Sequence, residues 1–116
     1  MGLGESFLRD FVEQCLRDAT ACQADLGKCA AQRDWSEFRE VAHAYKGIVE
    51  NLGAHAMAER CAQAMRADDA TLAREQARLI SELGAQLASV AEASRHEVTR
   101  LSRPRRGDAS DVPDAS

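Results

Sequence analysis

The sequence predicts an all-α fold, an antiparallel four-helix bundle followed by a disordered C-terminal tail. Hydrophobic residues make up 45% of the 116-residue chain but aromatic residues only 4%, and alanine is the most frequent residue, as in closely packed helices. The only prolines, Pro104 and Pro113, lie near the end of the chain, and no run of alternating β-branched residues precedes them. Apolar residues recur at intervals of three and four, which is the spacing of a helix face.

The first two helices are expected over residues 5–32 and 35–51. Asp34 followed by Glu37 has the spacing of a capping box at the start of the second helix. Gly53 provides its stop signal, because glycine enters the left-handed conformation after a helix without steric cost. The apolar stripe of the first helix comprises Leu8, Phe11, Val12, Cys15, Ala19, Cys22, Leu26 and Cys29, and that of the second comprises Trp35, Phe38, Ala42, Tyr45, Val49 and Leu52.

The third helix is expected over residues 54–67, and the fourth begins after Asp68 or Asp69 as its N-cap. The third buries Met57, Cys61, Ala64 and Met65, and the fourth has a stripe of Leu72, Leu79, Ile80, Leu83, Leu87 and Val90 that continues toward Val98 and Leu101. The far end of the fourth helix is expected to extend past the bundle. The domain therefore spans 1–101, and the proline-containing polar segment 102–116 is the expected disordered tail.

Charge and hydropathy exclude several classes of function. The formal net charge of −4 and the pI near 5.3 argue against a nucleic-acid surface, so the expected partners are proteins. The basic stretch "SRPRRG", residues 102–107, is expected to be a solvated end. No apolar run approaches the roughly 18 to 20 residues of a membrane span, and the first residues do not resemble a signal peptide. A cytoplasmic location and no membrane insertion are expected.

The four cysteines support a reducing compartment. Cys15, Cys22 and Cys29 are seven residues apart, so neighbours on one helix are separated by about 10 Å, too far for a disulfide. No CxxC pair or histidine pair offers a metal site together with Cys61. Buried thiols that behave as small hydrophobic side chains are the favoured interpretation.

The segment "HAYKG", His43 to Gly47, lies in the middle of the second expected helix, where glycine costs about 1 kcal/mol relative to alanine. Helical geometry places His43 roughly 130° from the centre of the apolar stripe and Gly47 nearly opposite it, so both are expected to face solvent. Most exposed helical histidines are solvated bystanders, and His55 and His96 are interpreted that way. His43 differs because a glycine on the wet face is best explained by something that must come close there.

This pattern fits phosphoryl transfer. A neutral imidazole is a good nucleophile near pH 7, and a phosphoryl group on its nitrogen remains reactive enough to be passed on. Lys46, one turn from His43, would favour an incoming phosphoryl group, and Gly47 would leave space for the active site of a partner. No P-loop, Gly-rich nucleotide loop or metal-ligand cluster accompanies them. No cofactor or metal is therefore expected, and donor and acceptor must be other proteins or domains.

The segment "AHAYKGIVENLGA", Ala42 to Ala54, resembles the motif of the histidine-containing phosphotransfer (HPt) domains of bacterial and eukaryotic phosphorelays. That motif has His, any residue, usually Leu, then Lys-Gly, two small residues, two variable ones, an aliphatic residue, Gly and Ala. The register matches without gaps, and the resemblance spans roughly residues 6–68. Tyr45 stands where leucine is usual, and Ile48 and Val49 stand where serine or alanine is usual.

The resemblance implies a four-helix bundle that carries a phosphoryl group on His43, with Lys46 stabilising the group and Gly47 giving clearance. In the family the group arrives from an aspartyl phosphate on a receiver domain and leaves to another receiver, whose own acidic pocket supplies Mg²⁺; the HPt domain binds no metal. Many such domains are the C-terminal module of a hybrid sensor histidine kinase, which can be membrane-anchored, and are not autonomous enzymes. The expected docking positions around the histidine are Arg39, Glu40, Ile48 and Glu50.

Two alternatives stay open. One is an HPt-like helical module that binds a receiver or another protein without carrying phosphate. The other is a bundle that only dimerises and in which the histidine is incidental. The complete His43, Lys46 and Gly47 set favours the carrier over both.

Overall fold

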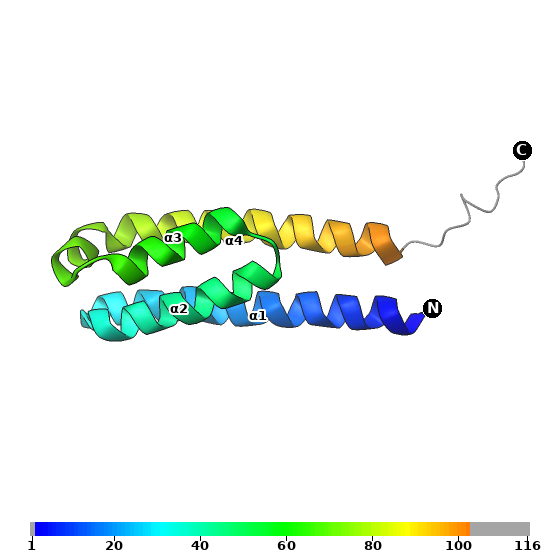
Figure 1. Cartoon of the computed structure of the whole chain (residues 1–116), viewed down its shortest axis with the longest axis horizontal. Helices are drawn as coiled ribbons and strands as arrows, with labels where there is room; N and C mark the ends of the chain where they lie inside the picture. Colours follow the sequence, from blue (N-terminus) through cyan, green and yellow to red (C-terminus); the bar gives the residue numbers. More distant parts are fainter. Residues whose placement is uncertain (1, 103–116) are drawn as a thin grey trace, which may run out of the picture.

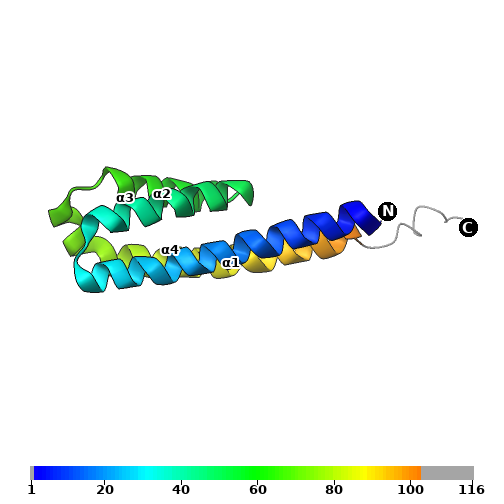
Figure 2. The same cartoon turned by 90° about the horizontal axis from the view of Figure 1, so that it is seen from below.

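The fold is all α-helical, as predicted. The computed structural model describes residues 2–102, which form four helices joined by short connections (Figure 1). The helices are α1 (Gly2–Gln32), α2 (Trp35–Asn51), α3 (His55–Arg66) and α4 (Asp69–Ser102). Successive helices run antiparallel and pack against each other, and α4 also packs against α1 (Figures 1 and 2). This confirms the predicted bundle; the tail expected over 102–116 lies outside the described residues, apart from Ser102 at the end of α4.

The predicted helix starts are confirmed where a side chain caps the backbone. Asp34 Oδ1 accepts a hydrogen bond from the Glu37 N–H at 3.1 Å and so caps α2. Asp68 is the cap of α4, because its Oδ1 accepts from the Thr71 N–H at 2.8 Å, and Asp69 is the first helical residue. Each cap satisfies a backbone donor that the first turn of a helix leaves without a partner.

Two helices end in the same hydrogen-bonding pattern with different residues. After α2, Gly53 has φ of 72°, and the Ala54 N–H donates to the Val49 carbonyl at 3.0 Å, which is the pattern of a Schellman motif. After α1 the left-handed residue is Arg33, with φ of 56°. A side chain in this conformation costs roughly 1 kcal/mol or more. The Arg33 guanidinium lies 5.9 Å from the centre of the Trp35 ring, a contact that offsets part of this cost.

The core is continuous through the half of the molecule in which all four helices meet. Its largest fully buried side chains are Tyr45, Phe38, Leu26, Met57, Leu72, Leu83, Val49 and Cys61. The predicted stripes supply most of these residues. The predictions for Phe11 and Met65 were wrong in degree, because Phe11 is exposed and Met65 is only half-buried.

The cysteines are free thiols, as predicted. Cys15, Cys29 and Cys61 are buried and Cys22 is half-buried. Burial raises the pKa of all four thiols, that of Cys61 to about 12, because the apolar surroundings disfavour the thiolate. Thiols in this state are weak nucleophiles and poor metal ligands, so they act as packing groups.

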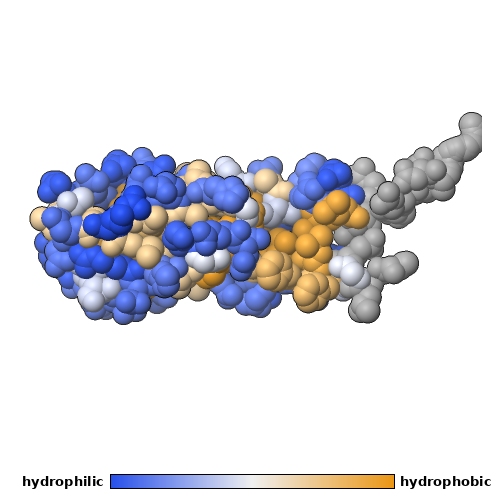
Figure 3. Space-filling model, viewed as in Figure 1, coloured by the Kyte–Doolittle hydropathy of each residue, from blue (hydrophilic) through white to orange (hydrophobic). Residues whose placement is uncertain are grey.

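The helices differ in length, and this gives the molecule two unlike halves. Because α1 and α4 have 31 and 34 residues but α2 and α3 only 17 and 12, the first two extend well beyond the turn between α2 and α3 (Figures 1 and 2). The described residues span 65 × 22 × 18 Å. We call the extension, residues 2–14 of α1 and 90–102 of α4, the arm. Exposed apolar side chains gather over the arm (Figure 3), and they include Phe7, Phe11 and Leu101.

Candidate functional site

His43 is exposed on α2, as its angular position predicts. Ala42, one residue before His43, and Tyr45, two residues after it, are fully buried. The same turn of α2 that anchors the helix in the core therefore presents the imidazole to solvent. His43 lies in the half of the molecule where all four helices pack. A nucleophile in this position is accessible to another protein and is held on a rigid element.

Lys46 is one turn away from His43 and is half-buried. Its Nζ lies 2.9 Å from Oε2 of Glu50, one further turn along α2. The side chains of Lys46 and Glu50 are 33% and 48% exposed, so solvent screens this ion pair and it stabilises the fold only slightly. A weak interaction therefore holds the lysine side chain toward Glu50.

Gly47 is exposed, and a Cβ atom built on it meets no other atom within 4 Å. Its backbone is helical, so no left-handed conformation requires glycine here. Nothing within the described part of the chain explains the stability that glycine gives up in a helix. This observation agrees with the interpretation that Gly47 clears space for an approaching partner.

Arg39 is the predicted docking residue with the most internal contacts. Its guanidinium donates to the Ala67 carbonyl at 3.0 Å and to the Trp35 carbonyl at 3.3 Å, and it pairs with Asp69 at 2.5 Å. These contacts tie α2 to the connection between α3 and α4. Arg39 thus has a structural role that sequence reasoning missed, and its docking role stays a prediction.

The other predicted docking residues are placed around the histidine in different ways. Glu40 and Glu50 are exposed, whereas Ile48 is half-buried and packs against the core. The side chain that a partner can reach at position 48 is therefore only part of the isoleucine. All three remain candidates for contact with a partner that descends over His43.

Beneath the site, a half-buried hydrogen-bond chain crosses the bundle. The Tyr45 hydroxyl donates to Gln23 Oε1 on α1 at 2.8 Å, and Gln23 Nε2 donates to the Ile80 carbonyl on α4 at 2.8 Å. Burial raises the pKa of Tyr45 far above its ordinary value, so its hydroxyl stays protonated as a donor. Gly84 gives the amide room, because a Cβ there would lie 3.1 Å from Gln23 Nε2. The chain fixes α2, two residues from the histidine, to both long helices.

Sequence reasoning did not find Gln23 or Gly84. A signal existed, because Tyr45 replaces the leucine of the family motif at a buried position, and a buried hydroxyl requires a hydrogen-bond partner. That requirement predicts a polar side chain on a neighbouring helix. It does not identify which residue, since Gln23 is far from Tyr45 in the sequence.

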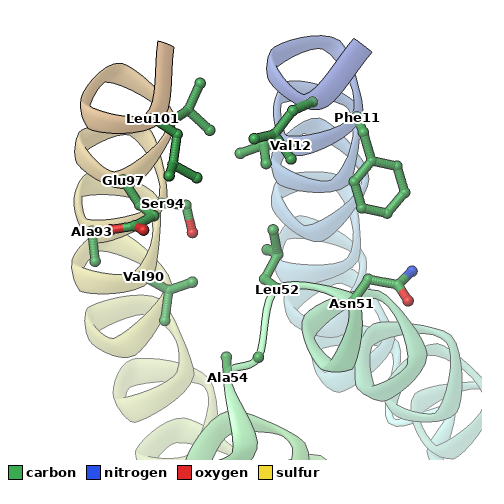
Figure 4. A pocket seen from close by; sticks show the side chains of 13 residues that line it. Phe11, Val12, Asn51, Leu52, Ala54, Val90, Ala93, Ser94, Glu97 and Leu101 are labelled. Carbon is green, nitrogen blue, oxygen red and sulfur yellow. The ribbon is translucent and has the colours of Figure 1, made fainter. Parts of the chain in front are cut away.

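A hollow of about 490 Å³ lies away from His43. It opens between the two helices of the arm above the turn between α2 and α3 (Figure 4). Its lining is mostly apolar and comprises Leu8, Phe11, Val12, Asn51, Leu52, Gly53, Ala54, Val90, Ala93, Ser94, Glu97, Val98 and Leu101. It contains none of the predicted site residues, which lie on an outer face of α2.

The side chains and helices of residues 2–102 bear on metal binding and on membrane insertion. These residues contain no group of three or more His, Cys, Asp or Glu side chains arranged to hold a metal ion. None of the four described helices is long and apolar enough to cross a membrane. The absence of a cofactor in this chain remains a prediction.

The fold and the site define an antiparallel helical bundle that carries His43, Lys46 and Gly47 on one helix. The chain belongs to the Hpt domain family, which it matches over residues 6–102. It is also similar to the sensory/regulatory protein RpfC from two strains of Xanthomonas campestris pv. campestris, with 40% identity over 87 residues in each case. The aligned part is 75% of this chain and 12% of RpfC, so the chain spans a small part of these curated relatives. No solved structure gives a significant match.

Family membership confirms the resemblance found in the sequence and extends it over α4, which the motif did not cover. It supports a phosphotransfer role in a two-component system. Hpt domains interact with receiver domains in phosphorelays.

Proposed function

We propose that the chain is a phosphocarrier of a multistep phosphorelay, which accepts a phosphoryl group on His43 from a receiver-domain aspartate and passes it to another receiver domain. The observation that carries the proposal is the exposure of His43 on a rigid helix beside Lys46 and the open space at Gly47. The similarity to RpfC supports a place within a larger sensory protein. A hybrid sensor kinase that carries this module on the cytoplasmic side fits both the exposed histidine and the similarity to RpfC.

The transfer step conserves atoms and charge. The lone pair of the unprotonated ring nitrogen of His43 forms the N–P bond while the P–O bond to the donor aspartate breaks, and the bonding electrons remain on the carboxylate. The ring keeps its other N–H proton, so no proton leaves in this step. Lys46 lies where its positive charge can offset the charge of the arriving phosphoryl group. The reverse sequence delivers the group to the next receiver, and Mg²⁺ acts in the receiver's acidic pocket.

The docking face is the exposed side of α2 around the histidine. Glu40 and Glu50 are exposed on the same face of α2 as His43, and Arg39 positions the start of this helix. Ile48 lies nearer the apolar face, and only part of its side chain is accessible. A receiver that descends over Gly47 would bring its aspartate to the imidazole. Because the hollow in the arm is elsewhere, nothing in it has to move for the partner to bind.

The test compares histidine variants for label transfer. A receiver domain phosphorylated with labelled acetyl phosphate and Mg²⁺ is incubated with the wild type, His43→Gln and His96→Gln, the last being an exposed histidine of α4 that serves as a matched control. We expect label on the wild type and on His96→Gln only. If a receiver binds the chain but transfers no label to the wild type or to His96→Gln, the chain is a binding module and not a carrier.

A further inference from the structure

The side chains of His43, Lys46 and Glu50 lie along one face of α2 in the order of the sequence. Helical geometry places Lys46 about 4.5 Å along the axis from His43 and Glu50 about 6 Å beyond it. The lysine side chain is long enough to lean either way. In the structure it leans away from the histidine, with Nζ 2.9 Å from Glu50 Oε2.

Glu50 is poorly placed for stabilising the helix. It lies in the last turn of α2, where the helix dipole disfavours a negative charge and where no basic residue occurs. A lysine that precedes its glutamate by four residues is also the weaker order of such a pair. Two unfavourable placements in one residue indicate a role other than helix stability, as does the glycine at position 47.

We infer that Glu50 weakens the hold of Lys46 on the phosphoryl group and thereby makes the group on His43 easier to give away. This inference rests on the proposed function. With His43 free, Glu50 neutralises Lys46. When His43 carries the phosphoryl group, its roughly two negative charges compete with the single charge of Glu50 for the lysine. The energy of breaking the Lys46–Glu50 pair is subtracted from the stabilisation that Lys46 gives.

Such an arrangement suits a carrier that must both accept and release. A lysine without a competitor would lower the free energy of the phosphorylated state and slow its onward transfer. A lysine with a counter-ion stabilises the phosphorylated state by less. The free energy of transferring the phosphoryl group to a receiver is then intermediate, so that both acceptance and release are possible. Glu50 is therefore a positioning residue, which acts on the reacting atoms only through Lys46.

The test is a double-mutant cycle on the lifetime of chemically phosphorylated protein. The wild type, Glu50→Gln, Lys46→Ala and the double variant are phosphorylated on histidine with phosphoramidate, and hydrolysis of the phosphohistidine is followed by ³¹P NMR. We expect Glu50→Gln to lengthen the lifetime about two- to threefold, the range set by an exposed ion pair of this kind. In the Lys46→Ala background, Glu50→Gln is expected to have no effect.

Glu40→Gln is the matched control, because Glu40 is also exposed, carries the same charge and lies within one turn of His43. The charge of Glu40 acts on the phosphoryl group directly through space. The change in phosphohistidine lifetime in Glu40→Gln should therefore be the same with and without Lys46. If Glu50→Gln lengthens the lifetime equally in the Lys46→Ala background, Glu50 also acts through space and the inference is wrong. An unchanged or shortened lifetime in Glu50→Gln contradicts it as well.

A second readout separates this inference from the proposed function. At equilibrium with a receiver, Glu50→Gln should shift the phosphoryl group toward His43 by the same two- to threefold factor. If the lifetimes behave as expected but no receiver labels His43, the tuning by Glu50 stands and the relay role fails. If receivers label His43 and neither readout responds to Glu50, the relay role stands and the inference fails.

Discussion

The two halves of the molecule are built from the same two long helices and differ in what covers them. In the bundle half, α2 and α3 lie over α1 and α4, and Phe38 is 1% exposed. In the arm no described helix lies over the same pair (Figures 1 and 2). Phe7 and Phe11, which lie in the arm, are 72% and 41% exposed. The periodicity of a helix thus predicts which face is apolar, but burial requires an opposing element. The histidine lies in the covered half, where its helix is held in place.

The largest expected effect comes from removing a phenylalanine ring in each half of the molecule. Phe38→Ala should lower the free energy of unfolding by about 3–5 kcal/mol, since it opens a cavity in the covered half. Phe11→Ala in the arm should cost about 1 kcal/mol or less, because much of its ring already contacts water. Urea unfolding measures both, and Phe38→Leu provides a milder core variant. Equal losses at the two positions would mean that the arm is covered in solution.

The next effect concerns the hydrogen-bond chain under the histidine. Tyr45→Phe removes the donor to Gln23 and should lower the free energy of unfolding by about 1 kcal/mol, because the half-buried Gln23 acceptor loses its partner. The double variant Tyr45→Phe/Gln23→Leu leaves no unpaired side-chain acceptor, but it also removes the donor to the Ile80 carbonyl, so it should recover at most a small part of this loss. Urea unfolding again gives the values. A neutral Tyr45→Phe would show that the tyrosine contributes only its ring.

Two glycines sharpen the comparison between an open helix face and a packed one. Gly47→Ala should raise stability by a few tenths to about 1 kcal/mol and slow phosphotransfer, because the new methyl group meets only the partner. Gly84→Ala should give a smaller gain or a loss, since its Cβ would approach Gln23 Nε2 to 3.1 Å and that amide is bonded on both sides. Equal gains, or undisturbed phosphotransfer in Gly47→Ala, would contradict this account.

The smallest effect concerns the arm. The hydrogen bonds from Arg95 hold the pKa of Glu13 below its ordinary value of 4.5, so the pair stabilises the fold at neutral pH and this contribution is lost as pH falls through the folded-state pKa. The stability difference between the wild type and Glu13→Gln should therefore shrink between about pH 6 and about pH 3. Glu92→Gln, at an exposed arm position, is the control. A difference that grows toward acid would contradict the assignment.

Local signals predicted most of the fold. Asp34 and Gly53 mark the ends of α2 because capping depends on residues within one turn, and the spacing of apolar residues gave the helix faces. The exposure of Phe11 was not predictable, because it depends on where α2 ends relative to α1. Leu16, which is 3% exposed and lies outside the predicted stripe, was missed for a related reason: neighbouring helices widen the buried face.

The candidate site likewise has features that a single helix determines and features that depend on the packing of several helices. The exposure of His43 followed from its angle on a single helix, and the open space beside Gly47 agreed with the sequence argument. The contacts of Arg39 and Gln23 were not predictable, since their partners lie on other helices and only the packing of those helices brings them together.

The most direct test of the central claim locates the phosphoryl group on the protein. The chain is labelled by a phosphorylated receiver, digested under alkaline conditions that preserve phosphohistidine, and its peptides are sequenced by mass spectrometry. The three histidines of the chain, His43, His55 and His96, are all exposed, so exposure does not select among them. The account predicts the group on His43 alone. A group on His55 or His96, or one spread over all three, would contradict it.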